Sequence, residues 1–413
     1  MKYVNFVIHV GITPHANLYH YDLPVALQER YGGFLSKQIV KDYADYAEFC
    51  FKTFGDRVKN WWTFNEPKVI ASLGFDNGIN PPNRCSKEFG NCTEGNSATE
   101  PYIAAHHLIL SHAEASKRYR EKYKVMIILE ILSVNAEQKG RVGVFADFVW
   151  YEPLTKSKAD NYAAQRARDF HIGWELISTH LRRELLSNLF CRFLHPFVYG
   201  EYPRTMQKIV GERLPKFSKS ELEIVKNSFD VLGLNHYTSY YIYDAHQPKT
   251  NVTGYEHDWN VGYACKSSIF SYFIYPKIFL VVLAHSPWIY EVPSGIYKVV
   301  TYVKERYGNP EIILSENGLI AGMDDPGNVP FPEALFDTNR VNYYTTYLKE
   351  LKRAMDDGAN VTGYFAWSML DNFEWLLGYT SRFGLIYVDY NDLKRYPKMS
   401  AYWFRQMLQR KIA

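Results

Sequence analysis

Two glutamates stand where apolar runs end, and their type and placement suit one kind of chemistry. Glu66 follows the run VKNWWTF by two residues, and Glu316 ends the run EIILSE. Cleavage of a glycosidic bond needs two carboxyl groups, one to protonate the departing oxygen and one to attack the sugar or activate water. The acid must keep its proton near neutral pH, which burial beside Trp61 and Trp62 would favour. Asn65, next to the first glutamate, suits a hydrogen bond to a sugar hydroxyl.

Short apolar runs alternate with long helical stretches, and these elements must position the two carboxyls. We predict strands near residues 15–20, 58–64, 141–149, 230–237, 311–316 and 361–367. We predict helices over residues 38–54, 100–119 and 338–357. Cap and stop residues fall where helices need them. Because crossovers of this length join parallel strands, the pattern predicts an α/β fold.

The ends of the predicted strands carry polar and aromatic residues. They are His20, Asn65-Glu66, Trp150-Tyr151-Glu152, Asn235-His236-Tyr237, Glu316-Asn317, and Trp367 followed by Asp371 and Glu374. In a closed (β/α)8 barrel all C-terminal strand ends face one mouth, which holds the active site. No glycine-rich turn follows the first run, so a dinucleotide-binding fold is not predicted. We therefore expect a (β/α)8 barrel as one domain over residues 1–413.

Composition limits the other function classes. The 413 residues carry 47 Lys and Arg against 44 Asp and Glu, so the net charge of +3 indicates no nucleic-acid partner. Aromatic residues reach 16%, with 34 Tyr, and most of them are expected in the core. Residues 263–285 form the most apolar stretch, but Pro276 and Lys277 split it, so no membrane span is expected.

Two features of the chain favour a secretory setting. Cys85 and Cys92 lie in a loop rich in Pro, Gly and Asn and could close a small disulfide, whereas no paired histidines nearby suggest zinc. Asn91-Cys92-Thr93 and Asn251-Val252-Thr253 match the N-glycosylation sequon. The first residues of the sequence do not resemble a signal peptide.

The two glutamates lie in motifs that resemble those of a known enzyme family. WWTFNEP (61–67) and ILSENG (313–318) resemble the two catalytic signatures of glycoside hydrolase family 1, the β-glucosidases. The resemblance covers most of the chain, and the sequence is similar to that of the plant members of the family. Its further blocks are ITPHANLYHYDLP, GNSATEPY, QKGRVGVFADFVWYEPL, DVLGLNHYTSYY, GYFAWSMLDNFEW and SRFGLIYVDY.

The resemblance implies roles for individual residues. Glu66 would be the general acid/base and Glu316 the nucleophile of a retaining mechanism, with carboxyls about 5–5.5 Å apart. Because thioglucosidases of the family replace the acid, the glutamate at position 66 implies an O-glycosidase. The implied substrate-binding residues are His20, Asn65 and Glu374 for glucose hydroxyls, Trp367 as the stacking floor, Trp375 as an indole donor, Asn235 as a residue that shapes the site, Tyr237 as holder of the nucleophile, Trp288 at the aglycone entrance, and Phe383 at the border of the glucose pocket.

The chain also departs from the family pattern. It starts just short of the GITPH block, so the first two strands of the pattern, with a sugar-binding glutamine and an arginine beside the nucleophile, are expected to be absent and the barrel incomplete. Loss of that arginine would raise the pKa of Glu316 and weaken its attack. Residues 125–137, 263–285 and 319–322 are unlike the family, and we interpret them as translated intron sequence or an altered gene model.

The leading functional hypothesis is retaining hydrolysis of β-D-glucosides, with a small β-glucoside or oligosaccharide as substrate. One alternative is a non-catalytic relative, either a glucoside-binding protein or a chain that does not fold. Another is transglucosylation, which shares the first half-reaction. The chemistry needs only carboxyls and water, so we expect no metal and no organic cofactor. The family resemblance favours the vacuole, the apoplast or the extracellular space.

Overall fold

The structure is a computed structural model, and it describes residues 2–124, 138–172, 194–245, 253–264, 282–283, 288–319, 329 and 331–409. Two compact units are present. The first comprises Met1–Asp147, Thr155–Gly233 and Ile242–Gly262, and the second comprises Phe148–Leu154, Leu234–Tyr241 and Tyr263–Ala413. The expectation of one domain over the whole chain stays a prediction.

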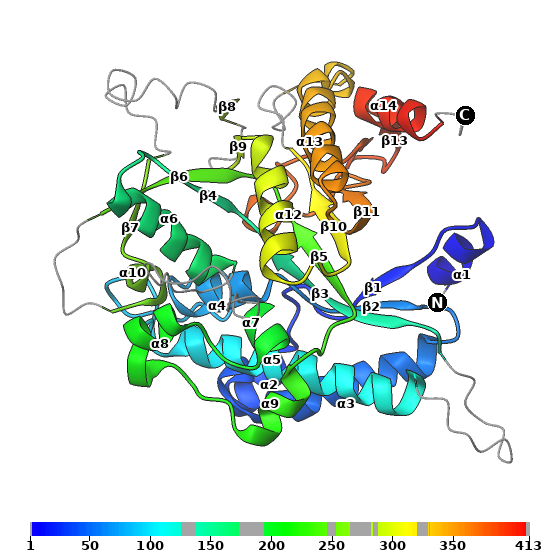
Figure 1. Cartoon of the computed structure of the whole chain (residues 1–413). Helices are drawn as coiled ribbons and strands as arrows, with labels where there is room; N and C mark the ends of the chain where they lie inside the picture. The colour runs from blue at the N-terminus through cyan, green and yellow to red at the C-terminus, as the bar shows by residue number, and fades with distance from the viewer. Residues whose placement is uncertain are drawn as a thin grey trace, which may run out of the picture. The chain divides into compact units, whose positions relative to one another are not determined.

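Parallel strands run through the first unit in chain order, β1-β2-β3-β5 (Figure 1). Their bounds are β1 His15–Asn17, β2 Asn60–Asn65, β3 Arg141–Asp147 and β5 Val231–Asn235. In the parallel registers, His15 lies opposite Asn60, and Asn60 lies opposite Arg141. Strand β2 is buried at every position, and the indoles of its Trp61 and Trp62 are almost fully covered.

The last two residues of β5 belong to the second unit. There β5 lies beside β10 Ile312–Asn317, and β10 pairs with β11 Val361–Ala366. The β10–β11 pairing is parallel, with Ile312 opposite Val361. All the strands predicted from the sequence are therefore present, although β1 ends three residues earlier than predicted. The predicted α/β class is confirmed.

The two helices predicted in the first unit begin and end at the predicted residues. Helix α3 spans Gln38–Phe54 with Gly55 as its C-cap, and α5 spans Glu100–Tyr119 with Pro in its first turn. Helix α5 packs against α3, against α4 Pro67–Phe75 and against strands β2 and β3 (Figure 1). The other helices of this unit are α1 Lys2–His9, α2 Val25–Tyr31, α6 Lys158–His171, α7 Leu194–Tyr199, α8 Arg204–Val210, α9 Lys219–Val225 and α10 Tyr255–Asp258.

In the second unit, α13 spans Thr338–Asp356 and packs against α12 Ser294–Arg306 and α14 Met399–Leu408. Small sheets complete the structure. Their strands are β4 Trp150–Pro153, β6 Ser239–Asp244, β7 Val261–Tyr263, β8 Val282–Leu283, β9 Tyr290–Glu291, β12 Ile386–Val388 and β13 Arg395–Pro397.

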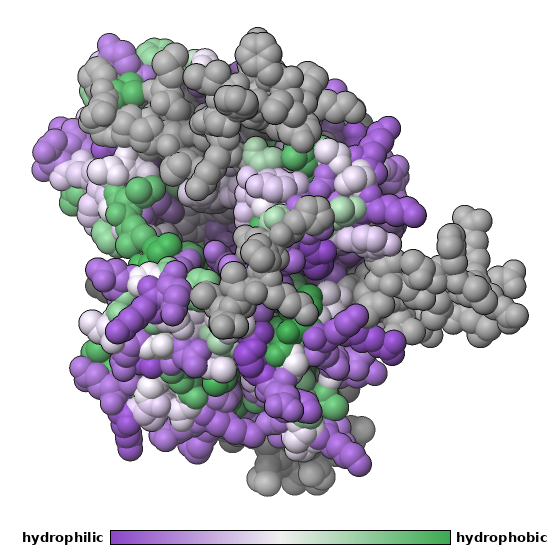
Figure 2. All heavy atoms as spheres, turned by 90° about the vertical axis from the view of Figure 1, so that its left-hand side faces the viewer, coloured by the Kyte–Doolittle hydropathy of each residue, from purple (hydrophilic) through white to green (hydrophobic). Residues whose placement is uncertain are grey.

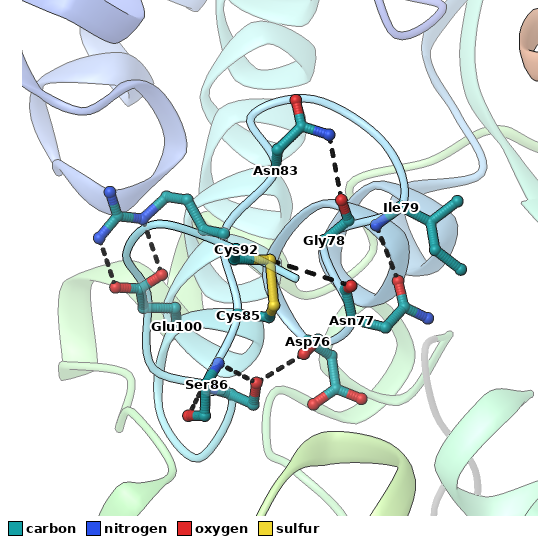
Figure 3. The surroundings of a disulfide bond; sticks show 11 residues. Asp76, Asn77, Gly78, Ile79, Asn83, Cys85, Ser86, Cys92 and Glu100 are labelled. Atoms are coloured by element: carbon teal, nitrogen blue, oxygen red, sulfur yellow. Dashed lines mark hydrogen bonds and ion pairs between the residues drawn. A yellow bond between two sulfur atoms is a disulfide. The ribbon is translucent and has the colours of Figure 1, made fainter. Parts of the chain in front are cut away.

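A disulfide joins Cys85 to Cys92 in the loop before α5 (Figure 3). Hydrogen bonds brace the same loop, because Ser86 and Ser97 exchange backbone N–H to hydroxyl bonds of 2.8 and 3.0 Å. Asn91, the acceptor residue of the first sequon, is exposed. The loop is therefore closed covalently with its sequon facing solvent.

Among the coloured residues of the face in Figure 2, most are hydrophilic, and some hydrophobic residues lie together toward the left of the middle. Exposed apolar surface is ordinary for a folded protein, so we assign this face no function. Within the described residues, no helix is long and apolar enough to cross a membrane.

Several sequence predictions fall outside the described residues. They concern residues 125–137, most of 263–285, residues 320–322 of the segment 319–322, and Asn251 and Val252 of the second sequon.

Candidate active site

Glu316 lies near the C-terminal end of β10, and its carboxylate is held by a phenol. The Tyr237 hydroxyl donates to Glu316 Oε2 at 2.7 Å. Glu316 is buried, and its backbone carbonyl accepts from the N–H of His236 at 2.9 Å. A hydroxyl that donates to a carboxylate favours the ionised form. The Tyr237 hydroxyl therefore orients the carboxylate and suits the ionised form that nucleophilic attack requires.

Asn235 and the aromatic residues predicted for the site gather around the same strand ends. Ser315, which precedes Glu316, donates through Oγ to Asn235 Oδ1 at 2.6 Å. The Tyr237 ring meets Trp288 and Phe383 edge to face, with centroids 5.6 and 6.1 Å away. Trp288 is exposed and Phe383 is buried, so this aromatic cluster faces solvent at Trp288 and the protein interior at Phe383.

Trp367 follows β11, and its backbone is fixed against β10. Its N–H donates to the Asn317 carbonyl at 2.9 Å. A Cβ on Gly318 would lie 2.1 Å from the Trp367 carbonyl oxygen, so only glycine permits this approach. The glycine of the ILSENG motif therefore places the half-buried indole of Trp367 one strand from Glu316.

Glu374 and Trp375 lie on the loop after β11, which a buried carboxylate anchors. Asp371 accepts from Arg382 at 2.7 Å and from Lys398 at 3.1 Å. It also accepts from the backbone N–H of Gly384 at 3.0 Å. Burial lowers the pKa of Lys398 to about 8, and the Asp371 carboxylate opposes that shift. The hydrogen bonds to the Asp371 carboxylate thus anchor the loop that carries both predicted sugar-binding residues.

Glu66 lies in the first unit, where β2 turns into α4. Its backbone adopts φ 45° and ψ 62°, the left-handed region, and Pro67 begins the helix. Its N–H donates to the Phe145 carbonyl at 2.9 Å. Glu66 therefore sits at the C-terminal end of a strand, as predicted.

A chain of hydrogen bonds within this unit leads to the Glu66 side chain. The Tyr21 hydroxyl donates to Glu66 Oε2 at 2.5 Å. The Asn65 amide donates to Tyr21 at 3.4 Å and to His20 Nε2 at 3.0 Å. Burial lowers the pKa of His20 to about 4, although Asp22 opposes the shift, so its imidazole is neutral at pH 6.

Tyr21 was missed by the sequence reasoning, which singled out its neighbour His20. Tyr21 has φ 69°, a conformation uncommon for a tyrosine. That backbone carries its ring to a carboxylate 45 residues away. The motif letters HYD contain the residue but give no sign of this conformation.

Three histidines outside the predicted set of site residues are buried and hydrogen-bonded. His106 contacts the hydroxyl of Tyr202 at 2.8 Å, and His107 contacts the carbonyl of Phe34 at 2.7 Å. His236 bonds the carbonyl of Phe148 at 2.6 Å. Within the described part of the chain, no group of three or more His, Cys, Asp or Glu is placed to hold a metal ion.

A family model described as glycosyl hydrolase family 1 matches residues 1–412. The chain belongs to this family. It is therefore an O-glycosyl hydrolase by family, and the predicted family is confirmed. β-Glucosidase 44 of Arabidopsis thaliana is 60% identical over 412 residues, which are 99% of this chain and 72% of that protein. β-Glucosidase 1 of Oryza sativa subsp. japonica is 55% identical over 410 residues, which are 99% of this chain and 71% of that protein.

Solved structures of family 1 proteins are similar over nearly the whole chain. A mutant of the rice Os3BGlu6 β-glucosidase, in a covalent complex with glucose, is 41% identical with a TM-score of 0.84 and matches 98% of this chain and 77% of its own. A β-glucosidase of the fungus Humicola insolens in complex with glucose is 35% identical, with the same TM-score and coverage. This similarity confirms the predicted (β/α)8 barrel class for our family 1 chain. Within the described residues the main sheet has six strands, in the order β1-β2-β3-β5-β10-β11, which agrees with the expected incomplete barrel.

Proposed function

We propose that this family 1 protein hydrolyses β-D-glucosides with retention, using Glu316 as nucleophile and Glu66 as acid/base. The observation that carries the proposal is the hydrogen bond from Tyr237 to Glu316. It places a donor on the carboxylate of the ILSENG motif, which orients that group and favours the ionised form. The covalent glucose complex of the rice relative supports a mechanism with a glycosyl-enzyme.

In the first step the Glu316 carboxylate attacks the anomeric carbon. The bond from that carbon to the aglycone oxygen breaks, and its electron pair stays on the oxygen, which takes the proton of Glu66. In the second step the Glu66 carboxylate takes a proton from water while the water oxygen attacks the same carbon. The bond to Glu316 breaks, so two inversions leave the β configuration unchanged.

The remaining candidate residues hold the sugar. His20, Asn65 and Glu374 would bond glucose hydroxyls, and Trp375 would add its indole N–H. The Trp367 ring would stack under the sugar. Asn235 shapes the site through its bond to Ser315. Trp288 would contact the aglycone, because it is exposed, while buried Phe383 would border the glucose pocket.

Hydrolysis of p-nitrophenyl β-D-glucoside by the purified chain tests the proposal, with circular dichroism on the same sample. Release of β-glucose, followed by NMR before mutarotation, is the expected result. A folded chain that binds glucose but releases no nitrophenol would favour the glucoside-binding alternative, and a chain without a cooperative fold would overturn the proposal. Alkyl glucosides as main products in added alcohol would favour transglucosylation.

Tyr21→Phe is expected to lower kcat/KM by about 10- to 100-fold on β-glucosides with alkyl leaving groups, because the hydrogen bond that orients the Glu66 carboxyl for proton transfer is lost. The loss should be several-fold smaller on 2,4-dinitrophenyl β-D-glucoside, whose leaving group needs no protonation. Steady-state kinetics on both substrates measure the difference. Tyr31→Phe is the matched control, because Tyr31 also donates to a carboxylate, Asp42, at 2.9 Å. Equal losses on both substrates would contradict a role in positioning the acid.

We also propose that the protein matures in a secretory compartment. The Cys85–Cys92 disulfide supports this proposal, since such bonds persist in oxidising compartments. The exposed sequon at Asn91 supports it independently.

When the chain is produced in a secreting eukaryotic host, Asn91 is expected to carry an N-glycan, because it is exposed on a surface loop. Asn91→Gln should therefore remove one glycan from the intact mass, and Ser86→Ala, which leaves the sequon intact, should not. An unmodified peptide containing Asn91 in the wild-type protein would contradict the prediction.

A further inference from the structure

A group of buried tyrosines on α13 lies behind the strand that carries Glu316. Tyr343, Tyr344 and Tyr347 are each fully buried, and the rings of Tyr343 and Tyr347 stack with centroids 3.9 Å apart. Packing alone would be served equally well by phenylalanine. A buried hydroxyl instead needs a hydrogen-bond partner, so the partners show what these residues do.

Two of the hydroxyls meet at one atom. Tyr343 donates to the backbone carbonyl of Tyr237 at 3.1 Å, and Tyr347 donates to the same carbonyl at 3.3 Å. The Tyr347 hydroxyl in turn accepts from the N–H of Val292 at 3.0 Å. The peptide of the residue that donates to Glu316 is therefore fixed from α13.

Tyr343 also reaches the strand of the nucleophile. Its hydroxyl accepts from Asn317 Nδ2 at 2.9 Å, and Asn317 is the residue after Glu316. The same amide nitrogen donates to the His236 carbonyl at 2.5 Å, while Tyr364 donates to Asn317 Oδ1 at 2.7 Å. The Asn317 side chain is completely buried. One hydroxyl thus ties the end of β5 to the end of β10.

We propose that Tyr343 and Tyr347 are positioning residues that hold Tyr237 and Glu316 in register for nucleophilic attack. Burial raises the pKa of Tyr343 well above its usual value, and that of Tyr347 as well, so both hydroxyls remain donors at every working pH. A misplacement of the nucleophile by a fraction of an ångström lowers the attack rate more than it lowers substrate binding. The inference rests on the proposed glucosidase activity.

Tyr343→Phe keeps the ring and removes only the hydroxyl. We expect kcat for p-nitrophenyl β-D-glucoside to fall about 3- to 10-fold, with KM changed less than twofold. Inactivation by 2,4-dinitrophenyl 2-deoxy-2-fluoro-β-D-glucoside, which reports nucleophilic attack alone, should slow by the same factor. Tyr255→Phe is the matched control, because its buried hydroxyl donates to the Phe170 carbonyl at 2.7 Å in the other unit.

A double-mutant cycle separates positioning from simple stability. If Tyr343 acts through Tyr237, the loss of kcat in Tyr343→Phe/Tyr237→Phe should be smaller than the product of the two single losses. A fully multiplicative effect, or an unchanged kcat with only a lower melting temperature, would overturn the proposal. Tyr347→Phe should show the same coupling more weakly, because Tyr343 still holds the carbonyl.

Hydrogen exchange provides a test that needs no activity. Peptides covering residues 234–238 and 313–318 should exchange faster in Tyr343→Phe than in wild type, and Tyr255→Phe should leave them unchanged. Unchanged exchange in both peptides would overturn the proposal whether or not the wild type turns over substrate. An inactive wild type with the expected exchange would instead refute the proposed function and leave the hydroxyl link supported.

Discussion

Replacing Glu316 with Gln is expected to abolish β-glucosidase turnover, with a loss on the order of 10⁵-fold, because an amide cannot attack the anomeric carbon. The substitution is nearly isosteric, and the Tyr237 hydroxyl can still donate to the amide oxygen that replaces Glu316 Oε2. The fold should therefore be kept. The measurement is release of p-nitrophenol from p-nitrophenyl β-D-glucoside by matched preparations of wild type and variant.

Glu311→Gln is the control for this change. Glu311 lies just before β10, at the end opposite Glu316, and Thr362 donates to its Oε1 at 2.6 Å. The Glu311→Gln variant should retain the wild-type kcat. Trapping with a 2-fluoroglucoside should add one sugar to the peptide that contains Glu316, and no sugar in Glu316→Gln. Turnover by the variant above a few per cent of wild type, or trapping on another residue, would show that the nucleophile lies elsewhere.

Glu66→Gln is expected to produce a loss that depends on the leaving group. Glutamine can neither protonate the departing oxygen nor take a proton from water, and general acid–base catalysis contributes about 10²- to 10⁴-fold. Cellobiose hydrolysis should fall by that factor, whereas glucosylation by 2,4-dinitrophenyl β-D-glucoside should be nearly unchanged. Rate constants from burst and steady-state phases separate the two steps.

Azide gives this variant a second readout. Azide needs no general base, so it should restore turnover of the dinitrophenyl substrate and yield β-glucosyl azide. Glu121→Gln, which replaces an exposed glutamate in the turn after α5, is the control and should not respond to azide. If Glu66→Gln loses the same factor on both substrates and azide has no effect, Glu66 is not the acid/base.

Much of the fold follows from local signals in the sequence. Helices α3, α5 and α13 have the predicted bounds or differ by one residue, because glycine and proline start or stop a helix within a single turn. Strand positions follow from apolar runs that must be buried. The positions of the two glutamates could be predicted for the same reason, since each lies at or just after the end of a strand-forming run.

The contacts that support the glutamates could not be read in this way. Tyr21 reaches Glu66 through a backbone conformation that nothing in its neighbours requires. Tyr343 and Tyr347 appear in the sequence as an aromatic face of α13, and the pattern does not reveal which carbonyl their hydroxyls meet. Lys398 reaches Asp371 across 27 residues. Such contacts depend on tertiary packing, which periodicity does not encode.

The left-handed backbone at Glu66 has a consequence for directed evolution. A side chain other than glycine or asparagine costs about 1 kcal/mol or more in that conformation. A library of this chain screened only for heat resistance should therefore enrich glycine or asparagine at position 66, and its winners would be inert. Selection for thermal stability and selection for turnover therefore favour different residues at position 66. An engineering strategy for stability should keep Glu66 and change other positions.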